Sequence, residues 1–434
     1  MTALPRLLIV SGVWPHVVGN REAANVICHQ ITCHLARSGL FDVRYVVINA
    51  FETAMPGAAG PEVEDLKALG VHFHEPVKAD LTPAAGAGAF NKLKAVAAGH
   101  SDRLIVGTGQ QDKLLRSLGG EMPDAVLAIW AETAGYMASS LPIPKFNYAG
   151  NPDHKVLEAR MELEDWLGGR SLLGRARDVM RLKVTRAGHL AAMRRYDLMW
   201  NVAANDAADY AAAGVNARYL QNMWPGAVHA DWQAGRDASE QTAPLKIVGN
   251  VGNISATGNS FGLMTLATQI VPRLKEKLGE GAFEVHLFGG GKPHPSVAPL
   301  LNDPHIRVRG FVDDIDAEIL SAPVFLVANN SQRFKVGHTR FLHAWSLGAC
   351  VVGFSDSAEA MPEIRHRENA LLGDTPEAVA DLVVEAGRDK ALRRAVAAGG
   401  IEMLTTAFNP ARVVGELIRD LDARLTSRKT GVAA

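Results

Sequence analysis

Cysteine is scarce in this chain, and the sequence has neither a long hydrophobic run nor an excess of charge of one sign. The 3 cysteines among 434 residues cannot form a disulfide framework, which favours a reducing compartment. The apolar runs, such as residues 322–328, are far shorter than the ~20 residues that span a bilayer. Lysine and arginine number 45 against 46 acidic residues, which argues against a protein that covers nucleic-acid phosphates.

The first segment, residues 1–15, contains a short apolar strand after one arginine. It lacks the basic end, the long apolar core and the small-residue cleavage site of a signal peptide. We therefore expect a cytoplasmic protein, either free or peripheral at the inner face of the membrane. At ~150 residues per domain, the length indicates about three domains or two large ones.

Short β-branched or aromatic runs recur along the chain, each followed by a turn and then by apolar residues at helical spacing. The strands expected in the first half are 7–10, 43–48, 103–107, 125–129, 145–148 and 198–202. Those expected in the second half are 245–248, 283–288, 306–308, 324–327 and 350–353. This alternation predicts an α/β fold with two Rossmann-like, doubly wound domains, whose ligands bind at the carboxyl ends of the strands.

A polar, weakly patterned stretch at 225–244 separates the two groups of strands and is the expected hinge. We expect one domain at 1–224 and the other at 245–408, with a cleft between them. A C-terminal helix at 409–434 is free to pack back on the first domain.

Residues 170–195 hold eight basic residues and one acid, Asp178, with apolar residues interleaved. One interpretation is a solvated helical face beside a buried apolar stripe. The other is a basic amphipathic surface for an anionic membrane or an anionic acceptor. The sequence leaves both interpretations open.

Glycine-containing loops follow three of the expected strands, at 11–21, 249–253 and 289–292. Glycines let backbone N–H groups approach a phosphate closely, although ordinary turn chemistry is the alternative. The first loop does not have the GxGxxG pattern of dinucleotide-binding proteins. The candidate binding residues in these loops are Gly19, Gly252, Asn253, Gly290, Gly291 and Lys292.

The densest group of potential ligand-binding residues lies between the strands at 324–327 and 350–353. A glycine and a threonine there suit the start of a helix, and the basic side chains near that start are able to offset charge on a departing diphosphate. A purely structural role for these side chains is the alternative. The group consists of Lys335, Gly337, His338, Thr339, Arg340 and His343.

Further motifs follow in a fixed order in the C-terminal half. They are Gly249–Gly252, Ile306–Asp313, Ala322–Val327, Leu347–Gly353, Met361–Ile364 and Glu368–Leu372. This series resembles the donor domain of GT-B glycosyltransferases, specifically the retaining family 4 group (glycosyl transferases group 1). The resemblance makes 306–313 a base-recognition segment ending near Phe311 and Val312, and it adds Glu363 to the donor site.

The resemblance implies that the C-terminal domain binds a nucleotide-diphosphate sugar and that the N-terminal domain binds the acceptor. It implies neither a metal nor a tightly bound cofactor. The chain departs from the family at the two glutamates that frame the helix ending at Gly348, where it has Lys335 and His343. His343 remains a candidate for the ribose contact, and the diphosphate charge would be met by Lys335, Arg340 or Lys292. The chain is therefore a divergent or a degenerate member.

Two strands of the N-terminal half are followed by acceptor candidates, Trp130 and Glu132 after one and Asn151 and Asp153 after the other. Asn20 and Arg21, in the first loop, complete this set. Family members often carry a histidine near the sugar, which makes His154 a catalytic candidate together with Lys335 and Arg340. The alternative for 151–154 is a turn that caps the next helix. Glu132 is a base only if transfer inverts, which the resemblance argues against.

We expect a metal-independent glycosyltransferase that moves a hexose-type sugar, with retention, to a glycan, a lipid or a small molecule. The alternatives are a non-catalytic sugar-nucleotide-binding or scaffold protein and a nucleotide-sugar epimerase. Nucleic acid is not an expected partner. Residues 28–34 contain two Cys-His pairs, but a single helix does not bring four such ligands together on a metal.

Overall fold

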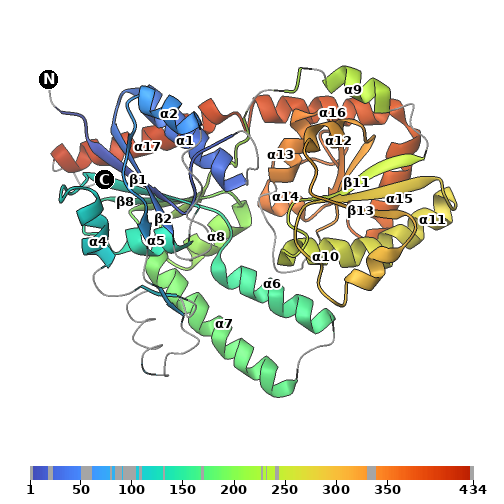
Figure 1. Ribbon diagram of the computed structural model, residues 1–434, viewed down its shortest axis with the longest axis horizontal. Helices are drawn as coiled ribbons and strands as arrows, with labels where there is room; N and C mark the ends of the chain where they lie inside the picture. The colour runs from blue at the N-terminus through green and yellow to red at the C-terminus, as the bar shows by residue number, and fades with distance from the viewer. Residues whose placement is uncertain are drawn as a thin grey trace. The chain divides into compact units, whose positions relative to one another are not determined.

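The computed structural model describes residues 3–17, 23–49, 61–78, 81–83, 90, 104–106, 110–130, 132–167, 171–225, 228–230, 232–239, 244–329 and 339–430. The chain divides into two compact units (Figure 1). Unit 1 consists of Met1–His154, Leu172–Gln221 and Pro410–Ala434. Unit 2 consists of Lys155–Ser171 and Asn222–Asn409.

Unit 1 is built on a parallel sheet in the order β10-β9-β8-β7-β1-β2-β3, with β4 paired to β2. Its strands are β1 (Arg6–Ser11), β2 (Asp42–Asn49), β3 (His72–Phe73), β4 (Val77–Lys78), β7 (Ala125–Ile129), β8 (Lys145–Ala149), β9 (Leu198–Asn201) and β10 (Ala217–Tyr219). All residues of β7 are buried, as parallel strands require when helices cover both faces of the sheet. The chain order reverses between β1 and β7, so the ligand position expected for this sheet lies at their carboxyl ends.

The helices of unit 1 cover this sheet, and residues 81–83 and 104–106 form a separate antiparallel pair. The helices are α1 (Ala23–Ser38), α2 (Pro61–Ala68), α4 (Gln110–Ser117), α5 (Glu132–Ser139), α7 (Leu172–Met193), α8 (Ala204–Ala212) and α17 (Pro410–Thr430). The pair consists of β5 (Leu81–Pro83) and β6 (Leu104–Val106). The strand expected at 103–107 as part of the parallel sheet is therefore an antiparallel strand outside it.

Unit 2 has a six-stranded parallel sheet in the order β13-β12-β11-β14-β15-β16. Its strands are β11 (Leu245–Val251), β12 (Phe283–Phe288), β13 (Ile306–Gly310), β14 (Val324–Val327), β15 (Cys350–Phe354) and β16 (Leu371–Gly373). This is the doubly wound order, and the direction of winding reverses between β11 and β14. A ligand is therefore expected beyond the carboxyl ends of these two strands.

The helices of unit 2 surround its sheet (Figure 1). They are α9 (Trp232–Ser239), α10 (Thr257–Thr265), η2 (Leu266–Ile270), α11 (Val271–Leu278), η3 (Ala298–Asn302), α12 (Ile315–Leu320), α13 (Thr339–Ser346), α14 (Ser357–Ala360), α15 (Pro376–Arg388) and α16 (Lys390–Thr405). The helix α6 (Asp153–Trp166) begins in unit 1, and its residues from Lys155 onward belong to unit 2. The segment η2 is a π-helix that leads into α11, whose second residue, Pro272, lacks the N–H that a continuous α-helix would use there.

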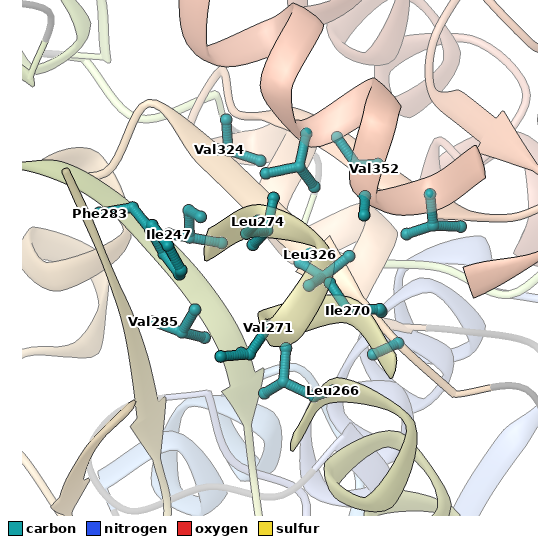
Figure 2. Packing of buried hydrophobic residues seen from close by; sticks show 14 of the residues in the cluster. Ile247, Leu266, Ile270, Val271, Leu274, Phe283, Val285, Val324, Leu326 and Val352 are labelled. Carbon is teal, nitrogen blue, oxygen red and sulfur yellow. The ribbon is translucent and has the colours of Figure 1, made fainter. Parts of the chain in front are cut away.

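The core of unit 2 fills the space between η2, α11 and the sheet. Figure 2 shows side chains of η2 and α11 facing side chains of the strands. The residues that it labels are Ile247, Leu266, Ile270, Val271, Leu274, Phe283, Val285, Val324, Leu326 and Val352. All of them are buried, and the apolar area that they remove from water is the main term holding the helices on the sheet.

The stretch at 225–244, expected as a hinge, contains a helix that packs on unit 2. Arg236 of α9 is buried, and its Nε donates to the Leu347 carbonyl oxygen at 3.0 Å. A Cβ on Gly348 would overlap the ring of Trp232, so this helix lies directly against the turn after α13. Residues 155–171, which the sequence analysis placed with the first 224 residues, cluster with unit 2 because Ala159 and Leu163 pack on Phe261.

The last helix, α17, packs against α1 in unit 1. The indole Nε1 of Trp200 on β9 donates to Asp420 at 3.0 Å, and Arg218 pairs with Glu416 at 3.5 Å. These contacts join the end of the chain to the sheet formed by its beginning. Within the described part of the chain, no helix combines the length and the hydropathy needed to cross a bilayer.

Candidate functional site

The candidate site in unit 2 lies beyond the carboxyl ends of β11 and β14. Gly252 and Asn253 follow β11, and Asn329 follows the end of β14. The helix α10 starts after the first loop, and α13 starts at Thr339. The expected switch-point position is therefore surrounded by two loops and the amino-terminal turns of two helices.

Glycines allow the loops after β11 and β12 to lie in contact. Gly289 has a φ of 129°, and a Cβ there would overlap the carbonyl oxygen of Gly252. Gly291 has a φ of 92°, and a Cβ there would overlap the Asn253 side-chain oxygen. Ile254 N donates to the Gly290 carbonyl oxygen at 2.9 Å, which joins the two loops. Only glycine combines this backbone conformation with so close an approach.

Asparagine side chains hold the same loops from within. Asn250 Nδ2 donates to the carbonyl oxygens of Gly252 and Phe288, both at 3.1 Å. Asn259 Nδ2, on α10, donates to the Asn253 carbonyl oxygen at 2.6 Å. These bonds satisfy backbone carbonyls without bulky side chains. Gly252, Gly289 and Gly291 together form what we call the glycine wall.

Arg340, in the first turn of α13, contacts asparagines of two of these loop and helix segments. Its Nη1 donates to Asn329 Oδ1 at 3.2 Å, and its Nη2 donates to Asn259 Oδ1. Burial lowers the pKa of Arg340 to about 10, so the guanidinium stays charged at neutral pH. Within the described residues no carboxylate forms an ion pair with it, and a half-buried cation held by neutral amides favours an anionic ligand.

His343, one turn further along α13, is already engaged. Its Nε2 lies 2.6 Å from Asp316 Oδ1, and its ring stacks on Trp224 with centroids 5.0 Å apart. The sequence analysis did not find either partner. In this structure the imidazole that was expected to contact a ribose is oriented by a carboxylate of α12 and an indole.

The other expected donor residues in unit 2 are spread along the same sheet edge. Gly290, Gly291 and Lys292 are exposed after β12, and Phe311, directly after β13, is 65% exposed. Val312 and Glu363 are half-buried, and the Glu363 carbonyl oxygen accepts from Asn369 Nδ2 at 2.8 Å. Thr339 is the first residue of α13. The predicted Gly19, Lys335, Gly337 and His338 lie outside the described residues.

In unit 1, Trp130 ends β7 at the switch point of that sheet. Its φ is 53°, which is rare for a large residue and costs of order 1–3 kcal/mol. Trp130 N donates to the Tyr148 carbonyl oxygen at 3.0 Å, and a Cβ on Gly150 would lie 2.9 Å from the indole. The neighbouring acceptor candidate Asn151 is exposed. Asn20, Arg21 and the side chain of Glu132 are outside the described residues.

Asp153 and His154 lie inside unit 1 rather than at its surface. Asp153 has no exposed surface and accepts a hydrogen bond from the Tyr136 hydroxyl at 2.7 Å. His154 is 7% exposed, and its ring centroid is 5.5 Å from that of His189. Both residues belong to the first turn of α6.

A chain of hydrogen bonds continues from Asp153 through His189. Because the Tyr136 proton points to Asp153, the Tyr136 oxygen accepts from His189 Nδ1 at 2.8 Å. His189 Nε2 then accepts from the Tyr210 hydroxyl at 2.5 Å. The network assigns a neutral histidine with its proton on Nδ1. Sequence reasoning missed it, because its members come from four separate helices.

This neutral histidine predicts a pH dependence of stability. Burial lowers the pKa of His189 from its ordinary 6.5, with Asp153 partly opposing the shift. Below about pH 6.5 the His189 imidazole therefore binds a proton in the unfolded chain but not in the folded chain. As a result, the free energy of unfolding falls as the pH drops below about 6.5, by at most about 1.4 kcal/mol per pH unit.

Urea titrations at pH 7, 6 and 5 measure this loss. Between pH 7 and pH 5 we expect the free energy of unfolding to fall less in His189→Gln than in the wild type, because the variant lacks this imidazole. The other buried histidines are common to both proteins and contribute equally. Equal losses in the two proteins would show that His189 does not titrate in this way.

A cavity of about 220 Å³ lies at the opposite edge of the unit 2 sheet. Trp232, Arg236, Cys350 and Arg393 line it, near the amino ends of β14 and β15. It is therefore separate from the glycine wall. Among the residues that the structure describes, no group of three or more histidine, cysteine, aspartate or glutamate side chains is placed to hold a metal ion.

The fold defined by these two doubly wound units is that of the GT-B glycosyltransferases. Structures with this fold match nearly the whole chain at low identity. HepE of Anabaena, in complex with UDP, has 12% identity, covers 96% of this chain and 100% of its own, and has a TM-score of 0.58. Sucrose-phosphate synthase of Thermosynechococcus elongatus has 14% identity, the same coverage and a TM-score of 0.62. The trehalose 6-phosphate synthase of Burkholderia multivorans has 12% identity and a TM-score of 0.63, and the match covers 100% of this chain and 99% of the synthase.

The sequence itself matches a family over part of its length. Residues 245–389 match the family described as "Glycosyl transferases group 1". This range contains all six strands of unit 2, the glycine wall and Arg340. No curated protein sequence matches the chain significantly. The resemblance inferred from the C-terminal motifs and the expected GT-B fold are both confirmed.

Proposed function

We propose that this protein is a glycosyltransferase that moves a hexose-type sugar from a nucleotide-diphosphate sugar to an acceptor, with retention of configuration. The observation that carries the proposal is the glycine wall of Gly252, Gly289 and Gly291 at the same sheet edge as the half-buried guanidinium of Arg340. The match of residues 245–389 to glycosyl transferases group 1 supports it. The acceptor in this proposal is a glycan, a lipid or a small molecule, bound at the carboxyl edge of unit 1.

The proposed chemistry depends on the charge of the leaving group. Breaking the bond between the sugar and the diphosphate leaves a second negative charge on the terminal phosphate. Arg340, together with Lys292 and the sequence-predicted Lys335, would neutralise this charge without a metal, and the amino terminus of α13 would add the positive end of its dipole. Because Asn259 and Asn329 already hold the guanidinium in place, little reorganisation is needed when the charge forms.

The nucleotide would lie along the glycine wall. Main-chain N–H groups of glycine loops suit a diphosphate, and the exposed ring of Phe311, directly after β13, would contact the base. HepE has been crystallised with UDP and with UDP-glucose. A uridine donor is therefore the first to test.

The experiment is a measurement of nucleoside diphosphate released from UDP-, GDP- and ADP-sugars, with and without a panel of glycan and lipid acceptors. We expect release from one donor that increases at least tenfold with one class of acceptor. Absence of release from every donor, in protein that still binds nucleotide, would contradict transfer.

One observation favours a second candidate, a sugar-nucleotide-binding protein without transfer activity. The chain has His343 where the family has a glutamate, and this histidine is held by Asp316 and Trp224. Binding of a sugar nucleotide with no turnover would establish this candidate. An epimerase is distinguished from both by conversion of the donor in the absence of any acceptor.

A further inference from the structure

The helix α7 has two different halves. In its carboxyl half, Thr185, His189, Leu190 and Met193 are buried against unit 1. In its amino half the structure buries Asp178, whereas almost every other residue is exposed. Figure 1 shows α7 as one long helix whose amino-terminal end lies away from the strands of unit 1. The amino half therefore needs an explanation other than core packing.

The exposed side chains of this half are unusually apolar. Leu172 and Leu173 are 83% and 85% exposed, Met180 is 62% exposed and Val179 is 46% exposed. Val179 and Met180 follow Leu172 by seven and eight residues, which is two turns of the helix. Ala176 lies one turn after Leu172, so these residues form one stripe along the helix. Four large apolar side chains at this exposure on half of one helix are not explained by the fold of unit 1.

Basic side chains border this stripe. At 100° per residue, Arg175 and Arg186 lie on one side of the apolar stripe. Arg177 and Arg181 lie on the other side, and Lys183 lies on the line of the stripe itself. All five are exposed. The one acidic residue of the helix, Asp178, is buried on the opposite face. The exposed face thus combines an apolar centre with positive charge along both borders.

We propose that the amino half of α7 docks this protein on an anionic lipid bilayer. The leucines, Val179 and Met180 would enter the acyl boundary, and the arginines would extend along the surface so that their guanidinium groups reach the lipid phosphates. The charge pattern favours an anionic bilayer over a second copy of the chain as the partner of this helix. A second copy of the chain would bring the same positive charge to the contact, whereas an anionic bilayer is complementary to both borders and to the centre.

This proposal is independent of the proposed glycosyl transfer, and its test needs no enzyme activity. The full chain is sedimented with vesicles of phosphatidylcholine alone and with vesicles that contain 30% phosphatidylglycerol. Two variants are compared with the wild type: Leu172→Ser/Leu173→Ser/Met180→Ser, and Arg177→Gln/Lys183→Gln/Arg186→Gln. The matched control removes three exposed positive charges of unit 2, as Lys277→Gln/Arg365→Gln/Arg388→Gln.

We expect the wild type to bind the anionic vesicles at least tenfold more strongly than the neutral ones. Each α7 variant is expected to lose at least tenfold of that binding, and the unit 2 control to stay within twofold. Equal binding to both vesicle types, or unchanged binding in the α7 variants, would overturn the proposal. Self-association that disappears in the leucine variant, without any vesicle binding, would also overturn it and assign this face to a second copy.

A second readout does not depend on comparing partition constants between variants. A polarity-sensitive dye on Met180→Cys is expected to shift to the blue with anionic vesicles, and a dye on Lys277→Cys is expected not to shift. The native Cys28, Cys33 and Cys350 are buried, and burial raises the pKa of each thiol, which limits their labelling. A dye on Met180→Cys that stays in water in the presence of bound vesicles would contradict the proposed insertion.

Discussion

Replacement of Arg340 by alanine is expected to lower kcat/KM for donor turnover by about 100- to 1,000-fold, the usual effect of removing one preorganised contact to a developing charge. The affinity for nucleoside diphosphate should fall at least tenfold as well. Arg340 is a half-buried arginine whose described partners are the neutral amides of Asn259 and Asn329, so its charge is available to an anionic ligand. Calorimetric titration with the diphosphate measures the affinity.

The controls separate this role from a structural one. Alanine at 340 leaves Asn259 Oδ1 and Asn329 Oδ1 without their donor, which costs about 1–3 kcal/mol of stability, so unfolding is measured in parallel. Arg340→Lys keeps the charge and should recover part of the affinity. Arg307→Ala removes an exposed arginine of β13 that pairs with Glu284 at 2.7 Å, and it should change neither quantity. Unchanged nucleotide affinity in folded Arg340→Ala would refute the assignment.

Substitution of Gly289 by alanine should destabilise unit 2 by about 3 kcal/mol and abolish nucleotide binding. The new Cβ would overlap the Gly252 carbonyl oxygen, and a φ of 129° is unfavourable for alanine. The neighbouring residue provides a matched control. Gly290 has no atom within 4 Å of an added Cβ, so Gly290→Ala should change stability by less than about 0.5 kcal/mol.

Urea unfolding of the two glycine variants, followed by circular dichroism, measures the difference. The two substitutions add the same methyl group to adjacent residues, so composition and helix propensity do not distinguish them. Equal stability of the two variants would mean that the loops after β11 and β12 are not in contact in solution.

The sequence predicted the long strands well because a buried parallel strand is a short, continuous apolar run. The run at 283–288 is strand β12 with the same ends, and the run at 324–327 is β14. The strands β3, β4, β5, β10 and β16 were missed, since two or three residues are too few to show a period. The stretch at 225–244 was expected to be a hinge because it is polar and weakly patterned, and the structure shows that it contains a helix whose Trp232 and Arg236 pack on unit 2.

The candidate site was predictable where local chemistry defines it. Glycines after a strand and an arginine at a helix start are visible in a sequence, and Gly252, Gly291 and Arg340 lie at one sheet edge in the structure. Contacts between residues far apart in the chain were not predictable. Asn259 and Asn329 contact Arg340 across intervals of 81 and 11 residues, and neither an asparagine in the first turn of a helix nor one after a strand carries a local signal of such a role.

We propose that the carboxyl edge of unit 2 binds a nucleotide-diphosphate sugar. Hydrogen exchange of the full chain, measured by mass spectrometry with and without UDP-, GDP- and ADP-sugars, tests it most directly. We expect one of these ligands to slow hydrogen exchange at 252–256 and 289–292. The exchange rate of 232–237, beside the cavity at the opposite edge, should not change. Protection confined to 232–237, or no protection by any of the three, would contradict it.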